Sequence, residues 1–259
     1  MSSVHQNPKS KILNPKSNIS MKVDILAIGV HPDDVELSCS GTLIKMIAQG
    51  KTVGLLDLTR GELGTRGSGE LRTIEASNSA KKMGALFREN LDMRDGFFKY
   101  TDENLLKIAK VIRKYQPKIV LANAVTDRHP DHGRAAKLTS DACFIAGLVK
   151  VEILDDNGKP YERWRPDHVY HYIQDEHLTP DFVIDITDHI EEKMEAILCY
   201  KSQFYDPNSD EPESPISSMN FLESVKAKNR VFGRPLNYDF AEGFTVERVI
   251  GVDSLFDLK

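Results

Sequence analysis

The chain has 259 residues, a length that fits one large α/β domain or two smaller ones and allows a substantial hydrophobic core. Its net charge of −5 argues against a nucleic-acid-binding protein, because such proteins usually carry a basic excess. The longest apolar runs, Ile25–Val30 and Thr52–Leu58, are too short to span a membrane. Three widely separated cysteines without a CxxC pair fit a reducing compartment, so we expect a cytoplasmic protein that binds neither nucleic acid nor membranes.

Residues 1–20 are predicted to form a flexible tail. They are mostly polar, and the sequence Asn-Pro-Lys-Ser occurs at 7–10 and again at 14–17. Such a segment cannot bury enough apolar surface to offset the entropy lost on ordering, and it lacks the apolar run of a signal peptide. A regular pattern begins at Met21, and no strong linker interrupts it, so residues 21–259 are expected to form a single domain.

Short apolar runs and stretches of helical periodicity alternate from Met21 to residue 146. Strands are expected at Val23–Val30, Thr52–Leu58, Asn90–Met93 and Ile119–Ala122. Helices are expected at Asp34–Ala48, Leu71–Met83, Asp102–Tyr115 and Gly133–Ala146. This alternation predicts an α/β fold with a mostly parallel sheet and helices on both faces.

The remainder of the chain continues the pattern less regularly. Further strands are expected at His168–Ile173 and Phe182–Ile186, followed by a helix at Thr187–Tyr200. Residues 206–215 are acidic and rich in Pro and Ser, which indicates a mobile loop. A helix at Asn220–Arg230 and a short final segment complete the prediction.

Ionisable residues follow each of the first four expected strands. They are His31-Pro32-Asp33-Asp34, Thr59-Arg60-Gly61-Glu62, Arg94-Asp95-Gly96 and Asp127-Arg128-His129-Pro130-Asp131-His132. Ligands of open parallel sheets bind beyond the carboxyl ends of the strands, so these four segments are expected to meet at one edge. Two His-Pro-Asp sequences at equivalent places make this edge the candidate site.

The two His-Pro-Asp segments contain the ligands of a metal site. His31 and Asp34 are three residues apart at a helix start, so both side chains can face one point, and His132 supplies a third ligand. Two histidines and a carboxylate suit a catalytic Zn²⁺ and also suit Fe²⁺. A single His-Pro-Asp-Asp sequence is more often a turn with an aspartate at the helix N-cap. The second such sequence, after another strand, favours the metal site.

The quoted residues resemble those of the PIG-L/LmbE-like zinc deacetylases, over about Lys22 to Gly251. The resemblance is carried by residues 27–36, 41–42, 59–62 and 64–67, Arg72, residues 95–96 and residues 128–133. It implies a Rossmann-like fold and hydrolysis of the acetamide of an N-acetylglucosamine derivative. It also implies that His31, Asp34 and His132 bind zinc and that Asp33 is the general base. His129, oriented by Asp131, would stabilise the oxyanion.

Within that family, the chain looks most like the deacetylases of bacillithiol biosynthesis, whose substrate is N-acetylglucosaminyl malate. This likeness rests on residues 127–133, 180–186, 200–204 and 241–244. The related enzymes tend to have a tyrosine in the late segment where this chain has Phe221, and Tyr205 or Tyr170 are candidate replacements. Related enzymes form oligomers, so a homo-oligomer, by resemblance a hexamer, is expected.

Malate is a dianion and the chain is acidic, so a local cation must receive it. Arg66 is the first candidate, with Lys201 and Arg128 as alternatives. Together with Arg72, Asp95 and Glu62, these form the predicted substrate contacts. The alternative for Asp95 is that it is only a turn residue, and the alternative for Glu62 is that it is only a charged loop residue exposed to solvent. His171, at a strand end, is a weaker site candidate, and His168 and His189 are predicted to be structural.

Two other classes of function remain open. A metal-dependent phosphoesterase also uses His and Asp ligands, but it usually needs more of them for two metals. A non-catalytic sugar-binding or scaffold protein would need neither Asp33 nor His129 in ionisable form. A dinucleotide-binding protein is disfavoured, because the first strand is followed by His-Pro-Asp-Asp and not by Gly-x-Gly-x-x-Gly.

Overall fold

The computed structural model describes residues 21–259, so the predicted tail lies outside the described residues. Within them, one sheet contains seven strands. The strands are β1 (Ile25–Gly29), β2 (Val53–Thr59), β3 (Phe87–Met93), β4 (Ile119–Ala122), β5 (His168–Tyr172), β6 (Phe182–Asp185) and β7 (Ala241–Val246). Their order across the sheet is β3-β2-β1-β4-β5-β7-β6.

The sheet is mostly parallel, as the strand–helix alternation predicts. Strands β1 to β5 pair in parallel, whereas β7 runs antiparallel between β5 and β6. Strand β7 lies in the short final segment of the prediction, for which the sequence pattern indicates no strand. Glu242 and Gly243 interrupt the apolar pattern of the segment, and its extended conformation comes from pairing with a neighbour on each side.

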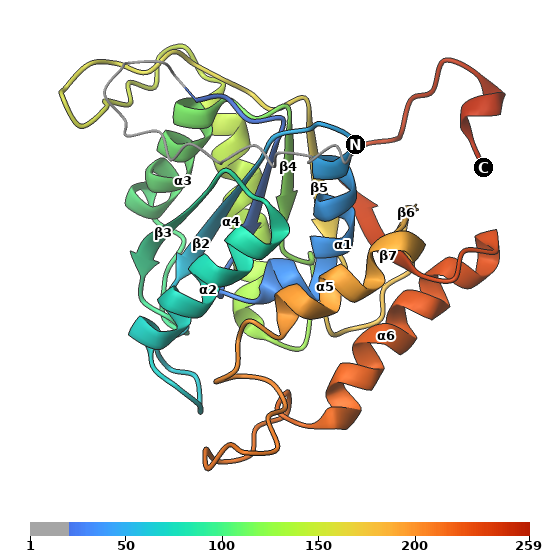
Figure 1. Cartoon of the computed structure of the whole chain (residues 1–259). Helices are drawn as coiled ribbons and strands as arrows, with labels where there is room; N and C mark the ends of the chain where they lie inside the picture. The colour runs from blue at the N-terminus through green and yellow to red at the C-terminus, as the bar shows by residue number, and fades with distance from the viewer. Residues whose placement is uncertain (1–20) are drawn as a thin grey trace, which may run out of the picture.

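Six α-helices surround the sheet in the described part of the chain (Figure 1). They are α1 (Asp34–Ala48), α2 (Gly69–Met83), α3 (Asp102–Tyr115), α4 (Pro130–Ala146), α5 (Ile190–Ile197) and α6 (Met219–Gly233). Helix α4 begins three residues earlier than predicted, because His129 caps it and Pro130 fits its first turn. The helix expected at Thr187–Tyr200 is shorter, since Thr187–His189 form a 3₁₀ turn and α5 ends at Ile197.

Two apolar layers hold the helices against opposite faces of the sheet. Along β1, Leu26 and Ile28 pack in a cluster with residues of α3 and α4. The alternate residues Ile25 and Ala27 pack in a second cluster with residues of α1, α2 and α5. The predicted arrangement of helices on both faces is therefore confirmed.

The way in which the chain connects strands and helices creates a crevice at the candidate site. The neighbouring strands β1 and β4 lead into helices on opposite faces, because α1 covers one face and α4 the other. The two chain segments diverge beyond the carboxyl ends of β1 and β4, which is where open α/β sheets bind ligands. In residues 21–259, no helix has the length and hydropathy needed to cross a membrane.

Candidate active site

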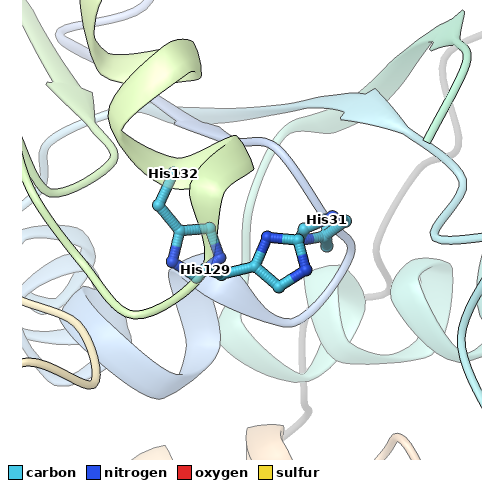
Figure 2. A group of neighbouring side chains, drawn as sticks. All are labelled: His31, His129 and His132. Atoms are coloured by element: carbon cyan, nitrogen blue, oxygen red, sulfur yellow. The ribbon is translucent and has the colours of Figure 1, made fainter. Parts of the chain in front are cut away.

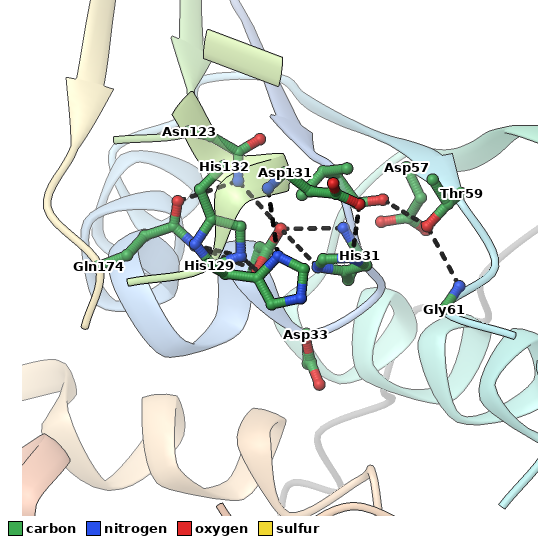
Figure 3. A network of polar contacts seen from close by, with 12 residues as sticks. His31, Asp33, Asp57, Thr59, Gly61, Asn123, His129, Asp131, His132 and Gln174 are labelled. Atoms are coloured by element: carbon green, nitrogen blue, oxygen red, sulfur yellow. Dashed lines mark hydrogen bonds and ion pairs between the residues drawn. The ribbon is translucent and has the colours of Figure 1, made fainter. Parts of the chain in front are cut away.

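The turn between β1 and α1 places Asp33 and Asp34 in different directions. Asp33 has φ 123°, a backbone conformation that costs a non-glycine residue about 1–3 kcal/mol, and its side chain makes no capping hydrogen bond to α1. Asp33 therefore occupies the N-cap position of α1, but its side chain does not cap the helix. Asp34 instead accepts a hydrogen bond from the His31 backbone N–H, 2.9 Å from N to Oδ2. Figure 3 shows the Asp33 carboxylate directed away from the imidazole rings.

The start of α4 brings two more histidines to the same place. His129 is the N-cap, and its Nδ1 accepts from the Asp131 backbone N–H at 3.2 Å. The ring centroid of His129 lies 4.7 Å from that of His31 and 5.1 Å from that of His132 (Figure 2). Because Nδ1 accepts this hydrogen bond, the neutral ring carries its proton on Nε2.

Asp34 lies between the two other imidazoles. Its Oδ1 is 3.2 Å from His132 Nε2, and its Oδ2 is 3.8 Å from His31 Nδ1. The structure thus brings His31, Asp34 and His132 together, as the spacing predicts. Two other groups have ligand atoms that all lie within 4.8 Å of one another in the described residues, namely His31 with His129 and His132, and His31 with Asp95 and Asp131.

His31 and His132 each have a carboxylate hydrogen-bonded to the ring nitrogen that is not near Asp34. Asp95 Oδ1 accepts from His31 Nε2 at 3.0 Å, and Asp127 Oδ2 accepts from His132 Nδ1 at 2.6 Å. Such carboxylate–histidine pairs are typical of metal-bound histidines, since they fix the ring and its tautomer. They leave His31 Nδ1 and His132 Nε2 as the ring nitrogens near Asp34.

The electrostatics of this cluster fit a divalent cation. Burial lowers the pKa of His31, yet hydrogen bonds and charges from Asp131, Asp95 and Asp34 outweigh burial and raise it to about 10. Burial likewise lowers the pKa of His132, while Asp34 and Asp127 raise it to about 9. The carboxylates therefore attract positive charge to the atoms that would ligate a metal, and a metal would replace those protons.

Asp33 has the properties that are expected of a general base. It is 5% exposed, and its Oδ2 has no hydrogen-bond partner in the described residues. Burial raises the pKa of Asp33 to about 7, with the Arg72 guanidinium opposing and the Asp34 charge adding to the effect. Arg72 Nη2 lies 3.5 Å from that oxygen. A carboxylate with a pKa near neutrality suits general base catalysis.

Three polar residues for which the sequence pattern predicts no individual role complete the site. Asn123 Nδ2 donates to Asp34 Oδ2 at 2.9 Å, and Gln174 Nε2 donates to Asp34 Oδ1 at 3.1 Å. Asp127 is the third, through its contact with His132. Asn123 and Gln174 come just after β4 and β5, so their position beyond strand ends is the signal that could have found them (Figure 3).

The Asp131 side chain does not contact His129 as the predicted orientation implies. Its carboxylate accepts from the Gly96 backbone N–H and from Arg134, both at 2.9 Å, and lies 3.7 Å from His31 Nε2. The contact of Asp131 with His129 is made by the backbone N–H. The His129 ring is therefore oriented by a backbone N–H of the first turn of α4 and not by the Asp131 carboxylate.

A cavity of about 590 Å³ opens in front of these groups. Of the predicted substrate contacts, it is lined by Arg72, Asp95 and Arg128. Phe221 also lines it, while Tyr170 and Tyr205 do not, so neither is placed to replace the expected tyrosine hydroxyl.

Three of the predicted substrate contacts lie elsewhere. The Glu62 carboxylate accepts from the Asp95 backbone N–H at 2.8 Å. Arg66 is buried and donates to Ser209 Oγ at 2.6 Å, and Lys201 is exposed outside the cavity. Arg66 and Lys201 are thus not placed to receive an anion there, because the segment between β2 and α2 folds Arg66 inward. His171 is bonded to the Asn123 carbonyl and to Glu247, away from the cavity.

Comparison with known proteins places the chain among sugar deacetylases and their relatives. Residues 26–143 match the family model PIG-L, described as GlcNAc-PI de-N-acetylase. Diacetylchitobiose deacetylase of Thermococcus kodakarensis is 32% identical over 193 residues, which cover 70% of each chain. The uncharacterised deacetylase YaiS of Escherichia coli is 30% identical over 133 residues, which cover 49% of this chain and 71% of that protein.

Solved structures agree in fold over most of the chain. The conserved protein TT1542 of Thermus thermophilus is 34% identical, with a TM-score of 0.79 over 89% of this chain and 98% of its own. N,N'-diacetylchitobiose deacetylase of Pyrococcus horikoshii is 25% identical, with a TM-score of 0.70 over 91% of this chain and 88% of its own. Because the fold, the relatives and the paired His-Pro-Asp segments agree, the chain belongs to the PIG-L family.

Proposed function

We propose that this protein is a metal-dependent deacetylase that hydrolyses the acetamide of an N-acetylglucosamine derivative. The observation that carries the proposal is the buried Asp33 carboxylate, whose Oδ2 accepts no hydrogen bond from the described residues, in one cavity with two imidazoles that are hydrogen-bonded to carboxylates. The deacetylase activity of the Thermococcus relative supports the same reaction class. The cavity volume of about 590 Å³ lies in the usual range for small-molecule sites.

The proposed metal ligands are His31, Asp34 and His132, with zinc as the first candidate and Fe²⁺ as the alternative. When bound there, the cation would supply Lewis acidity that polarises the amide carbonyl and acidifies water. Asp95 and Asp127 hold the two imidazoles in place, and Asn123 and Gln174 hold Asp34. These supporting contacts fix the donor atoms before substrate arrives.

Asp33 and His129 perform the proton and charge steps in this proposal. Asp33 takes a proton from the attacking water, while the carbonyl carbon becomes tetrahedral and its oxygen gains negative charge. The His129 Nε2–H donates a hydrogen bond to that oxygen, because its Nδ1 is already occupied by the Asp131 N–H. The C–N bond then breaks, and the amine leaves with a proton from Asp33 or His129.

For the substrate, we propose N-acetylglucosaminyl malate, with the bacillithiol pathway as the setting. This choice rests on the resemblance of residues 127–133 and 180–186 to the deacetylases of that pathway. The relatives found by comparison include enzymes named for diacetylchitobiose and for an inositol glycoside of acetamidoglucose, so these are the competing substrates. A cytoplasmic location and a homo-oligomeric state stay predictions.

Release of amine from a small set of N-acetyl sugars tests the proposal. The zinc-loaded protein is incubated with N-acetylglucosaminyl malate, methyl N-acetylglucosaminide, diacetylchitobiose and p-nitrophenyl phosphate. We expect amine and acetate in equal amounts from the N-acetyl sugars, with loss of activity on chelation and recovery with zinc. Phosphate release without amine would favour a phosphoesterase, and binding without any turnover would favour a sugar-binding protein. Either result would refute the deacetylase.

A further inference from the structure

One wall of the active-site cavity is formed by a face of helix α6. The residues of this α6 wall are Phe221, Ser224, Val225, Lys228 and Val231, spaced three or four apart on one side of the helix. The same cavity is also lined by the candidate metal ligands and Asp33. A ligand that fills the cavity therefore contacts both the catalytic groups and the α6 wall.

Lys228 is the basic residue of this wall. Its Nζ donates to the main-chain carbonyl oxygen of Gln174 at 2.5 Å. The side chain of the same Gln174 contacts Asp34 and His132. Lys228 is therefore separated from the candidate metal ligands by a single residue, and no further element of the fold lies between them.

Lys228 has no ion-pair partner among residues 21–259. No carboxylate oxygen of the described chain lies within 4.0 Å of its Nζ. The charges that face it are Asp175, Asp127 and Glu242, which attract it at longer range, and Lys193, which repels it. Burial and the Lys193 charge lower the pKa of Lys228 to about 8, so its ammonium group is less stable here than in water.

The other two strong cations of the cavity already have partners. Arg72 is buried, 3.5 Å from Asp33, and it donates to Gln203. Arg128 Nε lies 2.5 Å from Asp175 Oδ2 at the exposed rim. Lys228 is thus the strong cation of this cavity that has no carboxylate within 4.0 Å, in the part of the chain that the structure describes. A partly buried ammonium without a carboxylate is stabilised when an anion occupies the cavity.

We propose that Lys228 binds an anionic group on the aglycone of the sugar substrate and thereby determines specificity. The class of substrate is an N-acetylglucosaminide with a carboxylate or phosphate in the aglycone. The proposal rests on the proposed function, which it deepens, and it replaces Arg66 and Lys201 as the cation for malate. The buried apolar neighbour Val225 limits water at this wall, which strengthens an ion pair formed there.

The test compares anionic and neutral substrates in two lysine variants of α6. Lys228→Met removes the charge from the wall. Lys226→Met is the matched control, because Lys226 Nζ pairs with Glu191 at 3.0 Å and does not line the cavity. The measured quantity is kcat/KM for N-acetylglucosaminyl malate, for N-acetylglucosamine 1-phosphate and for neutral methyl N-acetylglucosaminide, each in wild-type and variant protein.

In Lys228→Met, we expect the ratio of kcat/KM for an anionic over the neutral substrate to fall by roughly 10–100-fold, the scale of a hydrogen bond to a charged group. Most of the change should be in KM, and Lys228→Arg should restore part of it. A loss confined to the malate substrate or to the phosphate identifies the anion, and either supports the proposal. An unchanged ratio in Lys228→Met, or an equal fall in Lys226→Met, would overturn it.

This test separates the two proposals from each other. If wild-type protein deacetylates the methyl glycoside but shows no Lys228-dependent preference for an anion, the specificity proposal fails and the deacetylase stands. If wild-type protein deacetylates none of the three, the proposed function fails. Calorimetric binding of glucosaminyl malate, the amine product, gives a readout without turnover. Weaker binding in Lys228→Met than in Lys226→Met is expected, and equal binding would count against Lys228.

Discussion

Two neighbouring aspartates at the start of α1 have different surroundings. Asp34 is surrounded by donors, from the His31 backbone, Asn123 and Gln174. Asp33 has one oxygen that accepts no hydrogen bond from the described residues, with the Arg72 guanidinium 3.5 Å away, and a backbone strained at φ 123°. Strain at such a residue persists only where the surrounding structure enforces it, which is common at active sites. The different partners are consistent with the proposed roles, metal binding for Asp34 and proton transfer for Asp33.

Substitution of each aspartate should therefore have a different consequence. Asp33→Asn is expected to keep its metal and to lose on the order of 10²–10⁴ in turnover, because a general base is removed. Asp34→Ala should lose metal affinity first, and excess zinc should partly restore its activity. Zinc content and kcat, measured side by side in both variants, test whether the two aspartates have these different roles. Metal-free Asp33→Asn together with zinc-loaded Asp34→Ala would reverse the roles.

His129→Ala is the control for the choice of third ligand. The imidazoles of His31, His129 and His132 are close enough to ligate one ion without Asp34. If His129 acts on the oxyanion as proposed, the variant should retain zinc at the wild-type level while turnover falls. Loss of zinc in His129→Ala, with zinc retained in Asp34→Ala, would instead assign the ion to the three imidazoles.

At the scale of elements, a buried ion pair joins α1, α5 and β7 behind the site. Lys193 Nζ lies 2.6 Å from Glu242 Oε1, and both side chains are fully buried. Lys193 also donates to the Leu37 carbonyl at 2.9 Å, and Glu242 accepts from the Gly41 backbone N–H at 3.0 Å. Leu37 and Gly41 are four residues apart, so their carbonyl and amide would bond each other in a regular helix. The ion pair thus binds polar groups of α1 and anchors that helix.

Removal of one partner of this pair should be costly. Lys193→Met leaves Glu242 buried without its counter-charge, and we expect it to lower the free energy of unfolding by about 3–5 kcal/mol. Urea denaturation of the purified variant measures this change. The double variant Lys193→Met/Glu242→Gln serves as a control, since it removes both charges and should recover part of the loss. A single variant as stable as wild type would show that the pair does not anchor α1.

At the scale of the whole molecule, the site joins two loops that are far apart in the chain. His31 and Asp34 follow β1, whereas His132 follows β4, and the two strands are neighbours in the sheet. A bound metal would therefore link the two halves of the sheet across the crevice. Because it binds only the folded chain, it adds to the stability of the whole domain.

Removal of the metal should lower the melting temperature. At a metal concentration 100–1,000 times the Kd, linkage gives about 2.7–4.1 kcal/mol, which corresponds to a decrease of roughly 5–15 °C for a chain of this size. Differential scanning calorimetry with and without chelator measures it, and zinc should reverse it. Asp34→Ala should respond little to chelator. Equal melting curves for wild-type protein with and without chelator would argue against a structural link through the metal.

Local sequence patterns by themselves determined the parallel α/β sheet and the meeting of His31, Asp34 and His132. Strand and helix periodicity, and the rule that parallel strands end at one edge, depend on residues close together in the chain. Tertiary structure decided the rest. Strand β7 forms because β5 and β6 pair with it, Gln174 reaches Asp34 from beyond the end of β5, with β4 between β5 and β1, and the folding of the loop after β2 turns Arg66 away from the cavity. Lys228 enters the site only because α6 packs beside the crevice, a long-range contact that no local pattern encodes.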